Sequence, residues 1–218
     1  MSHVPIWTVW RLKAVQARDR WRLRRLAARH PGLEVDPRAS SNFAVARYAL
    51  APGARLRIGP GVVTDRVPGA LLFSLEAGAE VEIAEGTWLR TEVEPVRIVA
   101  AEGARIAIGA DALLNGCHLS AKREIALGRR VWIGFGSRIL DSDQHDLDAQ
   151  RRERAEPVHV GDHSWIAADV TVLRGVRIGA HCVIGARSLV TRDLPDHALA
   201  FGFPAQPRGV VGDRSRTR

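Results

Sequence analysis

The feature that most constrains the fold of this 218-residue chain is a six-residue repeat between Val160 and Val190. Every sixth position carries an aliphatic residue, and the position four residues later is small or β-branched. The aliphatic positions are Val160, Ile166, Val172, Ile178, Ile184 and Val190, and the small positions are Ser164, Val170, Val176, Cys182 and Ser188. Repetition at a fixed period indicates an architecture of stacked, similar units.

A period of six fits a short strand followed by a corner. In each repeat the small residue and the next aliphatic residue are two positions apart, so both side chains point to the same face of a strand. A Gly or Ala often follows the aliphatic residue, as in Gly161, Ala167, Gly179 and Gly185, and glycine adopts backbone angles that other residues resist. Three such sides close a triangular coil of about eighteen residues with its aliphatic side chains stacked inside. The repeat therefore predicts a parallel β-helix.

A looser form of the same pattern begins near residue 53. The segments GARLRIGPG, GAEVEIAEG and GARIAIGAD place Ile58, Ile83 and Ile108 at intervals of 25 residues, and Leu127 follows after 19. We expect these segments to form irregular coils of the same stack, with insertions at the corners. The sequence thus predicts a β-helix domain over residues 36–205, followed by a C-terminal tail over 206–218 that is frayed from residue 209.

Three tryptophans occupy one position of the repeat. Trp88, Trp132 and Trp165 each directly precede an aliphatic core position, so their side chains should point outward. Outward tryptophans at one repeat position suggest a subunit face or the wall of a groove. The alternative is that each is a surface residue covered by a loop.

The positive charge of the chain is concentrated at its beginning. The formal net charge is +8, of which residues 1–30 carry +7 and the rest of the chain only +1. A nearly neutral body argues against nucleic-acid binding as the main function. No apolar run approaches the roughly 18 residues that a membrane-spanning helix needs, so we expect a cytoplasmic protein, with peripheral membrane contact as an option.

A basic helix is expected within residues 1–35. Residues 6–29 contain no Gly or Pro, and Pro31 and Gly32 follow them. The residues that could face the body are Leu12, Val15, Leu23 and Leu26, with Trp7, Trp10 and Trp21 beside them. The helix is then either packed on the body with a solvated arginine face, or an interfacial helix that holds the protein near anionic lipid.

A polar segment interrupts the repeat between Leu140 and Val158. It opens with Asp141, Asp143 and His145, and Asp146 and Asp148 lie just beyond. A neutral imidazole can accept a proton from a hydroxyl near neutral pH, and a neighbouring carboxylate can fix its tautomer. The same composition also occurs in inert loops and in metal sites. Oxygen-rich Asp clusters suit a hard cation, but the intervening His does not, and no calcium-loop glycine pattern is present.

Two long segments carry a resemblance to a known family. EIALGRRVWIGFGSRILDSDQH and VHVGDHSWIAADVTVLRGVRIGAHCVIGARSLVTRDLPDHALAFGFPAQ resemble the hexapeptide-repeat acyltransferases, in the branch of galactoside, maltose and polysaccharide O-acetyltransferases. The resemblance covers residues 105–208 well and 53–104 loosely. It implies an all-β, left-handed parallel β-helix with an added N-terminal α-helix, acetyl-CoA as co-substrate, a sugar or glycan hydroxyl as acceptor, no required metal, and a homotrimer.

The resemblance also implies roles for individual residues. His145 matches the general base, with Asp141 or Asp143 as its orienting partner, and Asn115 matches a position near the acceptor. The residues implied near the cofactor are Ala168, Ala186, Thr191, Arg192 and Arg208. Trp165 is added to them as a groove wall because of its outward repeat position. Three positions depart from the family pattern: Arg192 stands in place of Lys, Arg187 in place of Gly, and Phe203 in place of Asn.

Several alternatives stay open at this point. The acceptor can instead be an antibiotic or another xenobiotic, or an amino sugar acetylated on nitrogen. A chain of this kind can also serve as a non-catalytic scaffold or a lipid-surface adaptor. A third rival is zinc-dependent hydration as in the β-helix carbonic anhydrases, for which the candidate ligands are His118, His159, His163 and His181.

Overall fold

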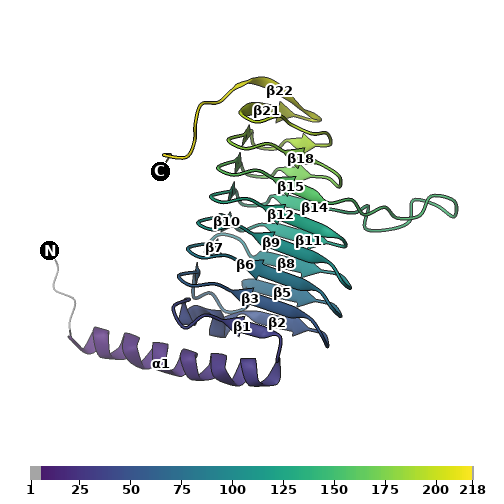
Figure 1. Cartoon of the computed structure of the whole chain (residues 1–218). Coiled ribbons are helices and arrows are strands. Elements are labelled where there is room, and N and C mark those ends of the chain that lie inside the picture. The colour runs from purple at the N-terminus through teal and green to yellow at the C-terminus, as the bar shows by residue number, and fades with distance from the viewer. Residues whose placement is uncertain (1–5, 218) are drawn as a thin grey trace.

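The computed structural model describes residues 6–217, which form a left-handed parallel β-helix with one long helix at its N-terminal end (Figure 1). Each coil contributes one strand to each of three sheets, here called sheets A, B and C. Sheet A contains β1 (Leu33–Val35), β3 (Arg55–Ile58), β6 (Glu80–Ile83), β9 (Arg105–Ile108), β12 (Glu124–Leu127), β15 (Val158–Val160) and β18 (Arg177–Ile178). Sheet B contains β2 (Arg47–Leu50), β5 (Leu71–Leu75), β8 (Val96–Ala100), β11 (His118–Ala121), β14 (Arg138–Leu140), β17 (Thr171–Val172) and β20 (Leu189–Val190). Sheet C contains β4 (Val63–Thr64), β7 (Trp88–Arg90), β10 (Leu113–Asn115), β13 (Trp132–Ile133), β16 (Trp165–Ile166), β19 (Val183–Ile184), β21 (Ala198–Gly202) and β22 (Ala205–Val210).

The register of sheet A joins the loose and the strict repeats into one stack. Ile58 pairs with Ile83, Ile83 with Ile108, and Ile108 with Leu127. Leu127 then pairs with Val160, and Val160 with Ile178. The irregular early coils predicted from the 25-residue spacing are therefore confirmed as continuous with the strict repeat.

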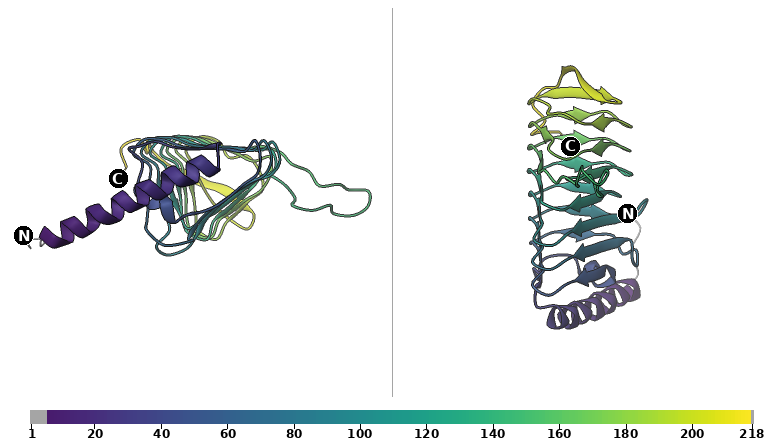
Figure 2. Two further views of the ribbon diagram at one scale, coloured as in Figure 1. Left: turned by 90° about the horizontal axis from the view of Figure 1, so that it is seen from below. Right: turned by 90° about the vertical axis from the view of Figure 1, so that its right-hand side faces the viewer.

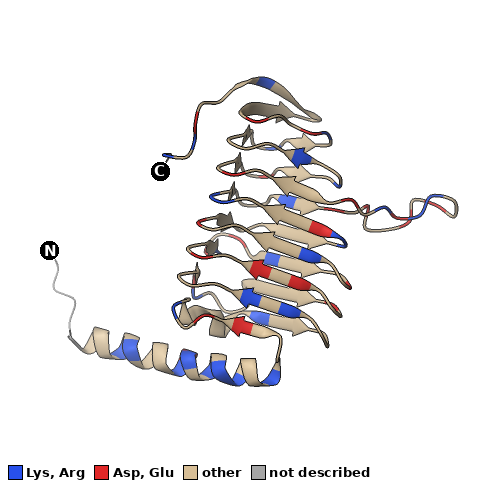
Figure 3. Ribbon diagram, viewed as in Figure 1, with Lys and Arg blue, Asp and Glu red and all other residues tan. Residues whose placement is uncertain are grey.

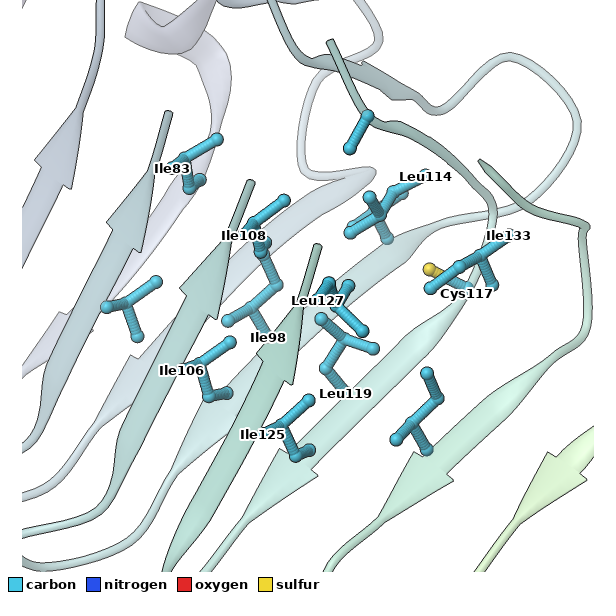
Figure 4. Packing of buried hydrophobic residues seen from close by; sticks show 14 of the residues in the cluster. Ile83, Ile98, Ile106, Ile108, Leu114, Cys117, Leu119, Ile125, Leu127 and Ile133 are labelled. Carbon is cyan, nitrogen blue, oxygen red and sulfur yellow. The ribbon is translucent and has the colours of Figure 1, made fainter. Parts of the chain in front are cut away.

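The core is a column of aliphatic side chains enclosed by the three sheets (Figure 4). The six aliphatic residues of the strict repeat are at most 3% exposed, and the five small residues at most 2%. Burying one such aliphatic side chain contributes about 1.5–3 kcal/mol. The inward assignment of both positions of the repeat is thus confirmed, including Cys182, which is a buried free thiol.

The long helix α1 (Ile6–Arg29) crosses the N-terminal end of the β-helix and extends beyond its triangular outline (Figure 2). Of the residues expected to face the body, Leu23 is buried, and Val15 and Leu26 are half-buried. Leu12 is 57% exposed, so its inward assignment is wrong. The reason is geometric, because this part of the helix lies past the edge of the coil it would have to cover.

The two ends of the β-helix differ from the boundaries that the sequence suggested. Strand β1 pairs with β3, so sheet A begins before residue 36. At the other end β22 pairs with β21 as an antiparallel hairpin, and the chain then returns along the coils (Figure 1). Arg214 donates from its backbone N–H to His181 Nδ1 at 3.0 Å and from Nε to the His163 carbonyl at 3.0 Å. The expected fraying from residue 209 is therefore wrong for the described residues, because backbone pairing and Arg214 hold this segment.

Within residues 6–217, no helix is both long and apolar enough to cross a bilayer.

A short 3-10 helix, η1 (Ser41–Val45), packs between α1 and the first coils, with Phe43 fully buried.

Candidate functional site

The polar segment 141–157 leaves the stack between β14 of sheet B and β15 of sheet A and projects far from the coils (Figures 1 and 2). Its two arms pair near the base. Ser142 and Ala155 form an antiparallel bridge, and the Asp143 N–H donates to the Arg154 carbonyl at 3.0 Å. The loop is thus a ribbon attached at the corner between sheets B and A, which we call the B–A corner.

Asp141 fixes the base of the loop to the coil below. Its carboxylate is fully buried and accepts hydrogen bonds of 2.7 Å from the backbone N–H groups of Lys122, Arg123 and Glu124. Burial raises the pKa of Asp141, and these N–H donors oppose that rise. All the hydrogen bonds of this carboxylate are to backbone, so it anchors the loop.

Asp143 is engaged by the coil above. Arg174, in the corner between β17 and β18, donates from Nε to Asp143 Oδ1 at 2.6 Å and from Nη1 to Glu156 Oε1 at 2.7 Å. The hydrogen bond from Arg174 lowers the pKa of Asp143, which stays ionised. The sequence predicts that Asp141 or Asp143 orients His145. Within the described residues of one chain, both carboxylates have other partners and neither is hydrogen-bonded to His145.

His145 is exposed on the outgoing arm of the loop. The residue before it is held from two sides. Lys122 Nζ donates to the Gln144 carbonyl at 3.2 Å, and the same ammonium bonds Glu153 on the returning arm at 2.7 Å. Gln144 itself has a left-handed backbone, with φ of 70°, and its side chain donates to Ser142 Oγ. The backbone leading to His145 is therefore fixed, while its ring is open to solvent.

The residues predicted near the cofactor lie in four places: two corners, strand β22 and, for Trp165, the outer face of sheet C. Thr191 and Arg192 are exposed at the B–A corner. They lie one coil above Arg174, because the chain just before Arg174 pairs with the chain just before Thr191, where the Leu173 N–H donates to the Val190 carbonyl at 3.0 Å. Ala168 and Ala186 occupy the corner between sheets C and B, where the Arg187 N–H donates to the Ala168 carbonyl. Arg208 is exposed on β22.

Trp165 and Asn115 lie on the outer face of sheet C. Together with Trp132, Arg214 and Thr217 they line a groove of about 400 Å³. The Arg214 guanidinium lies 5.9 Å from the ring centre of Trp132 and 5.7 Å from that of Trp165. Asn115 Oδ1 is buried there and has no hydrogen-bond partner among the residues that the structure describes. The structure thus brings Thr191 and Arg192 to the corner that carries the His145 loop, and places Asn115 and Trp165 elsewhere on the same chain.

The histidines considered as zinc ligands do not gather as a ligand set. His163, His181 and His197 stack at the corner between sheets A and C, with ring centres 5.0 and 4.8 Å apart. His159 lies on the outer face of sheet A and His118 on sheet B. In the part of the chain that the structure describes, no three His, Cys, Asp or Glu side chains converge as metal ligands would.

A wider, shallow hollow of about 710 Å³ lies along the last coils of sheet A. His159, considered above as a zinc ligand, lines it together with Arg177 and Asp193, and none of the residues predicted for catalysis, acceptor binding or cofactor binding does.

Sequence reasoning missed the residues that hold the loop. Lys122 and Arg174 both sit in B–A corners, one coil below and one coil above the loop. The available signal was their position, since both are basic residues at B–A corners on either side of an acidic insertion.

Comparisons with known proteins agree with the repeat and the fold. Residues 157–192 match the family described as bacterial transferase hexapeptide (six repeats). Over 95 residues the chain is 38% identical to a galactoside O-acetyltransferase of Lactococcus lactis, covering 41% of this chain and 45% of that protein. It is 29% identical over 154 residues to a "probable acetyltransferase" of Mycobacterium tuberculosis, covering 68% of this chain and 48% of that protein. The chain spans about half the length of these curated relatives.

Two solved structures share the architecture. A polySia-specific acetyltransferase superposes with a TM-score of 0.61 at 21% identity, covering 87% of this chain and 92% of that one. A polysialic acid O-acetyltransferase superposes with a TM-score of 0.59 at 15% identity, covering 84% and 87%. The resemblance to hexapeptide-repeat acyltransferases, inferred from the sequence, is confirmed.

Proposed function

We propose that this chain transfers an acetyl group from acetyl-CoA to a hydroxyl of a sugar or glycan, with His145 as the general base. The observation that carries the proposal is the position of His145. It lies on a loop whose base is pinned to the hexapeptide coils, at the corner that also holds Thr191 and Arg192. The similarity to a galactoside O-acetyltransferase supports the reaction class and the kind of acceptor.

The chemistry needs one base and one oxyanion site. The His145 imidazole takes the proton of the acceptor hydroxyl while the hydroxyl oxygen attacks the thioester carbonyl carbon. The carbon–sulfur bond then breaks, the acetyl ester forms, and the CoA thiolate is protonated by the imidazolium. Backbone N–H groups at a coil corner can stabilise the oxyanion of the tetrahedral intermediate. Holding both substrates in one groove supplies much of the rate.

The chain offers suitable contacts for acetyl-CoA, which acts here as a substrate. Ala168 is half-buried and Ala186 is exposed, and the corner backbone at these two residues would line the pantetheine arm. Arg187 stands where the family pattern has Gly, and its side chain is 87% exposed. The arginine side chain therefore extends into solvent and does not cover the corner. Arg187 and Arg192 can bind the phosphates of the cofactor, because guanidinium groups bind phosphate in a bidentate manner.

The proposed site is completed by a second copy of the chain. In one chain His145 lies on the B–A corner, whereas Ala168 and Ala186 lie on the corner across sheet B. A homotrimer with closed cyclic symmetry would place the loop of one subunit beside the coil corners of its neighbour. Acetyl-CoA and acceptor would then meet between two subunits.

Two rival hypotheses of function predict different products. Acetylation of an amino sugar or an antibiotic amine would use the same base and give an amide. A non-catalytic scaffold would give no product, and the exposure of His145 in the single chain is the observation that favours this reading.

The test is a transfer assay with radiolabelled acetyl-CoA and a panel of oligosaccharides, glycolipid intermediates and aminoglycosides. We expect label to enter a sugar acceptor as an ester that hydroxylamine removes. Label that resists hydroxylamine would identify N-acetylation instead. No labelled product from any acceptor, together with no release of CoA, would favour the scaffold. The mass in solution, compared with 23.9 kDa for one chain, tests the trimer in the same preparation.

A further inference from the structure

The helix α1 presents two different apolar faces. One faces the β-helix through Leu23, which is 6% exposed, and Leu26. The other is formed by residues that follow one another at intervals of three, four or seven positions, which places them on one side of a helix. Its members are Trp7, Trp10, Ala14, Ala17, Trp21 and Ala28, and all of them are exposed.

The second face points away from the body. Consecutive residues of an α-helix are about 100° apart. Trp21 is two residues from both Asp19 and Leu23, so it lies roughly 200° around the helix from each, on the side opposite to these two buried side chains. Trp7, Trp10 and Trp21 are 63%, 67% and 56% exposed. Because the helix crosses the end of the stack, this face forms the outer surface of that end of the molecule (Figures 1 and 2).

The charges of the helix flank the tryptophan face on both sides. By the same helical geometry, Lys13, Arg20 and Arg24 lie along one edge, and Arg11, Arg18, Arg22, Arg25 and Arg29 along the other. Lys13 lies 5.8 Å from the ring centre of Trp10, and Arg25 lies 4.7 Å from that of Trp21. Figure 3 shows this series of basic residues along the helix.

The acidic residue of α1 is withdrawn from this surface. Asp19 is 2% exposed and bonds Arg66 of the body, whose Nε lies 2.9 Å from Asp19 Oδ2 and whose Nη2 lies 3.2 Å from Oδ1. The exposed charges of α1 (Ile6–Arg29) are therefore all cationic. The pair also fixes the rotation of the helix, since it holds the opposite side against the body.

We propose that this face of α1 binds an anionic phospholipid surface, with Trp7, Trp10 and Trp21 inserted at the level of the headgroups. A narrow apolar stripe edged by arginines suits a helix that lies in the plane of an interface. Tryptophan favours the membrane–water boundary, and each basic residue is attracted by the negative surface potential. Pairing with the same face of a second copy is disfavoured, because both edges of each helix are cationic. The helix is about 36 Å long. It can therefore lie along the lipid surface while the coils of the β-helix extend away from that surface.

Vesicle binding by the full chain tests the proposal. We expect sedimentation with vesicles of phosphatidylcholine and phosphatidylglycerol, weakening as salt rises, and no binding to pure phosphatidylcholine. Tryptophan emission should shift to the blue on binding. The double variant Trp10→Ala/Trp21→Ala should lose about tenfold in affinity or more. Its matched control is Trp88→Ala, which removes an exposed tryptophan of sheet C and should bind as the wild type does.

The charge contribution is tested separately. Arg24→Gln/Arg25→Gln should weaken binding to anionic vesicles by about tenfold or more, whereas Arg55→Gln/Arg57→Gln on sheet A should not. Circular dichroism and thermal unfolding establish that each variant is folded. The proposal is overturned if the helix tryptophan variant binds as the wild type does, or if pure phosphatidylcholine binds equally. It is also overturned if heparin or RNA binds while vesicles do not.

Discussion

Arg174 donates a hydrogen bond of 2.6 Å from Nε to Asp143 Oδ1 and so joins the coil that contains β17 to the outgoing arm of the His145 loop. The side chains of Arg174 and Asp143 are only 23% and 18% exposed, and Nη1 of the same guanidinium bonds Glu156 on the returning arm. A charged hydrogen bond in this partly buried setting is stronger than a solvated surface pair. Both arms of the loop therefore depend on one side chain of the coil above.

Replacing Arg174 should release the loop without unfolding the coils. In Arg174→Ala, Asp143 and Glu156 lose their shared donor, and we expect the unfolding free energy to fall by about 1–3 kcal/mol. Trypsin should cleave the variant faster than the wild type at the arginines of the loop. Arg138→Ala, an exposed residue on β14, serves as the control. Equal cleavage rates for wild type and Arg174→Ala would show that the pair does not hold the loop.

Asp141 should be important for stability rather than for proton transfer. Asp141→Ala leaves three backbone N–H groups without their acceptor, at a cost of about 1–3 kcal/mol for each buried donor left unpaired. Asp141→Asn keeps one carbonyl oxygen and should lose less. Denaturant unfolding measures both. A wild-type midpoint for Asp141→Ala would contradict the anchoring role.

The histidine stack should make stability depend on pH. Burial lowers the pKa of His163, and the neighbouring His181 and Arg129 lower it further, while Asp162 opposes them. The unfolded chain then binds a proton at higher pH than the folded chain. Stability is therefore highest above about pH 6.5 and falls as the pH drops from there to the folded pKa.

The variant His163→Asn tests this dependence. Asparagine tolerates the left-handed backbone that His163 adopts, with φ of 59°. The loss of melting temperature between neutral and mildly acidic pH should be smaller in this variant than in the wild type. His159→Asn, whose ring lies on the outer face of sheet A, should keep the wild-type profile. An unchanged profile in His163→Asn would assign the acid sensitivity to other groups.

The inward assignment of the repeat has its own test. Ile178 is 2% exposed, so Ile178→Asp buries an unpaired charge and should leave no folded protein at ordinary temperature. Its neighbour Arg177 points outward on the same strand, and Arg177→Asn should unfold close to the wild type. A soluble Ile178→Asp protein with cooperative unfolding would refute the assignment.

The repeat made the coils predictable because inward and outward positions alternate with a fixed period. Ile58, Ile83 and Ile108 were placed in one register by spacing alone, and the structure agrees. The helix was predictable as a helix, but its two faces were not, because the position of the body decides which apolar stripe is buried. Leu12 fits the inward stripe and is still exposed.

The loop was less predictable than the coils, because its geometry rests on contacts between residues distant in sequence. Nothing local to Asp143 shows that Arg174 is its partner, 31 residues later. The C-terminal segment is similar, since Arg214 is held by His181 and by tryptophans of sheet C. A periodic pattern does not encode such pairings.

The last prediction concerns His145. An alcohol does not lose its proton near neutral pH without a base within hydrogen-bond reach, and imidazole is suited to that task. His145→Asn keeps a polar side chain of similar size and removes the base. Loss of a general base costs about 10²–10⁴ in rate, so kcat for a confirmed acceptor should fall by that order.

The fold should not change, because the His145 ring is exposed, while the backbone before it is held by Lys122 through the Gln144 carbonyl. Melting temperature, oligomer mass and the affinity for acetyl-CoA should therefore match the wild type. His159→Asn is again the control and should keep most of the activity. Near-normal turnover by His145→Asn would mean that the proton is taken by another group, and His118 on sheet B would be the next histidine to replace.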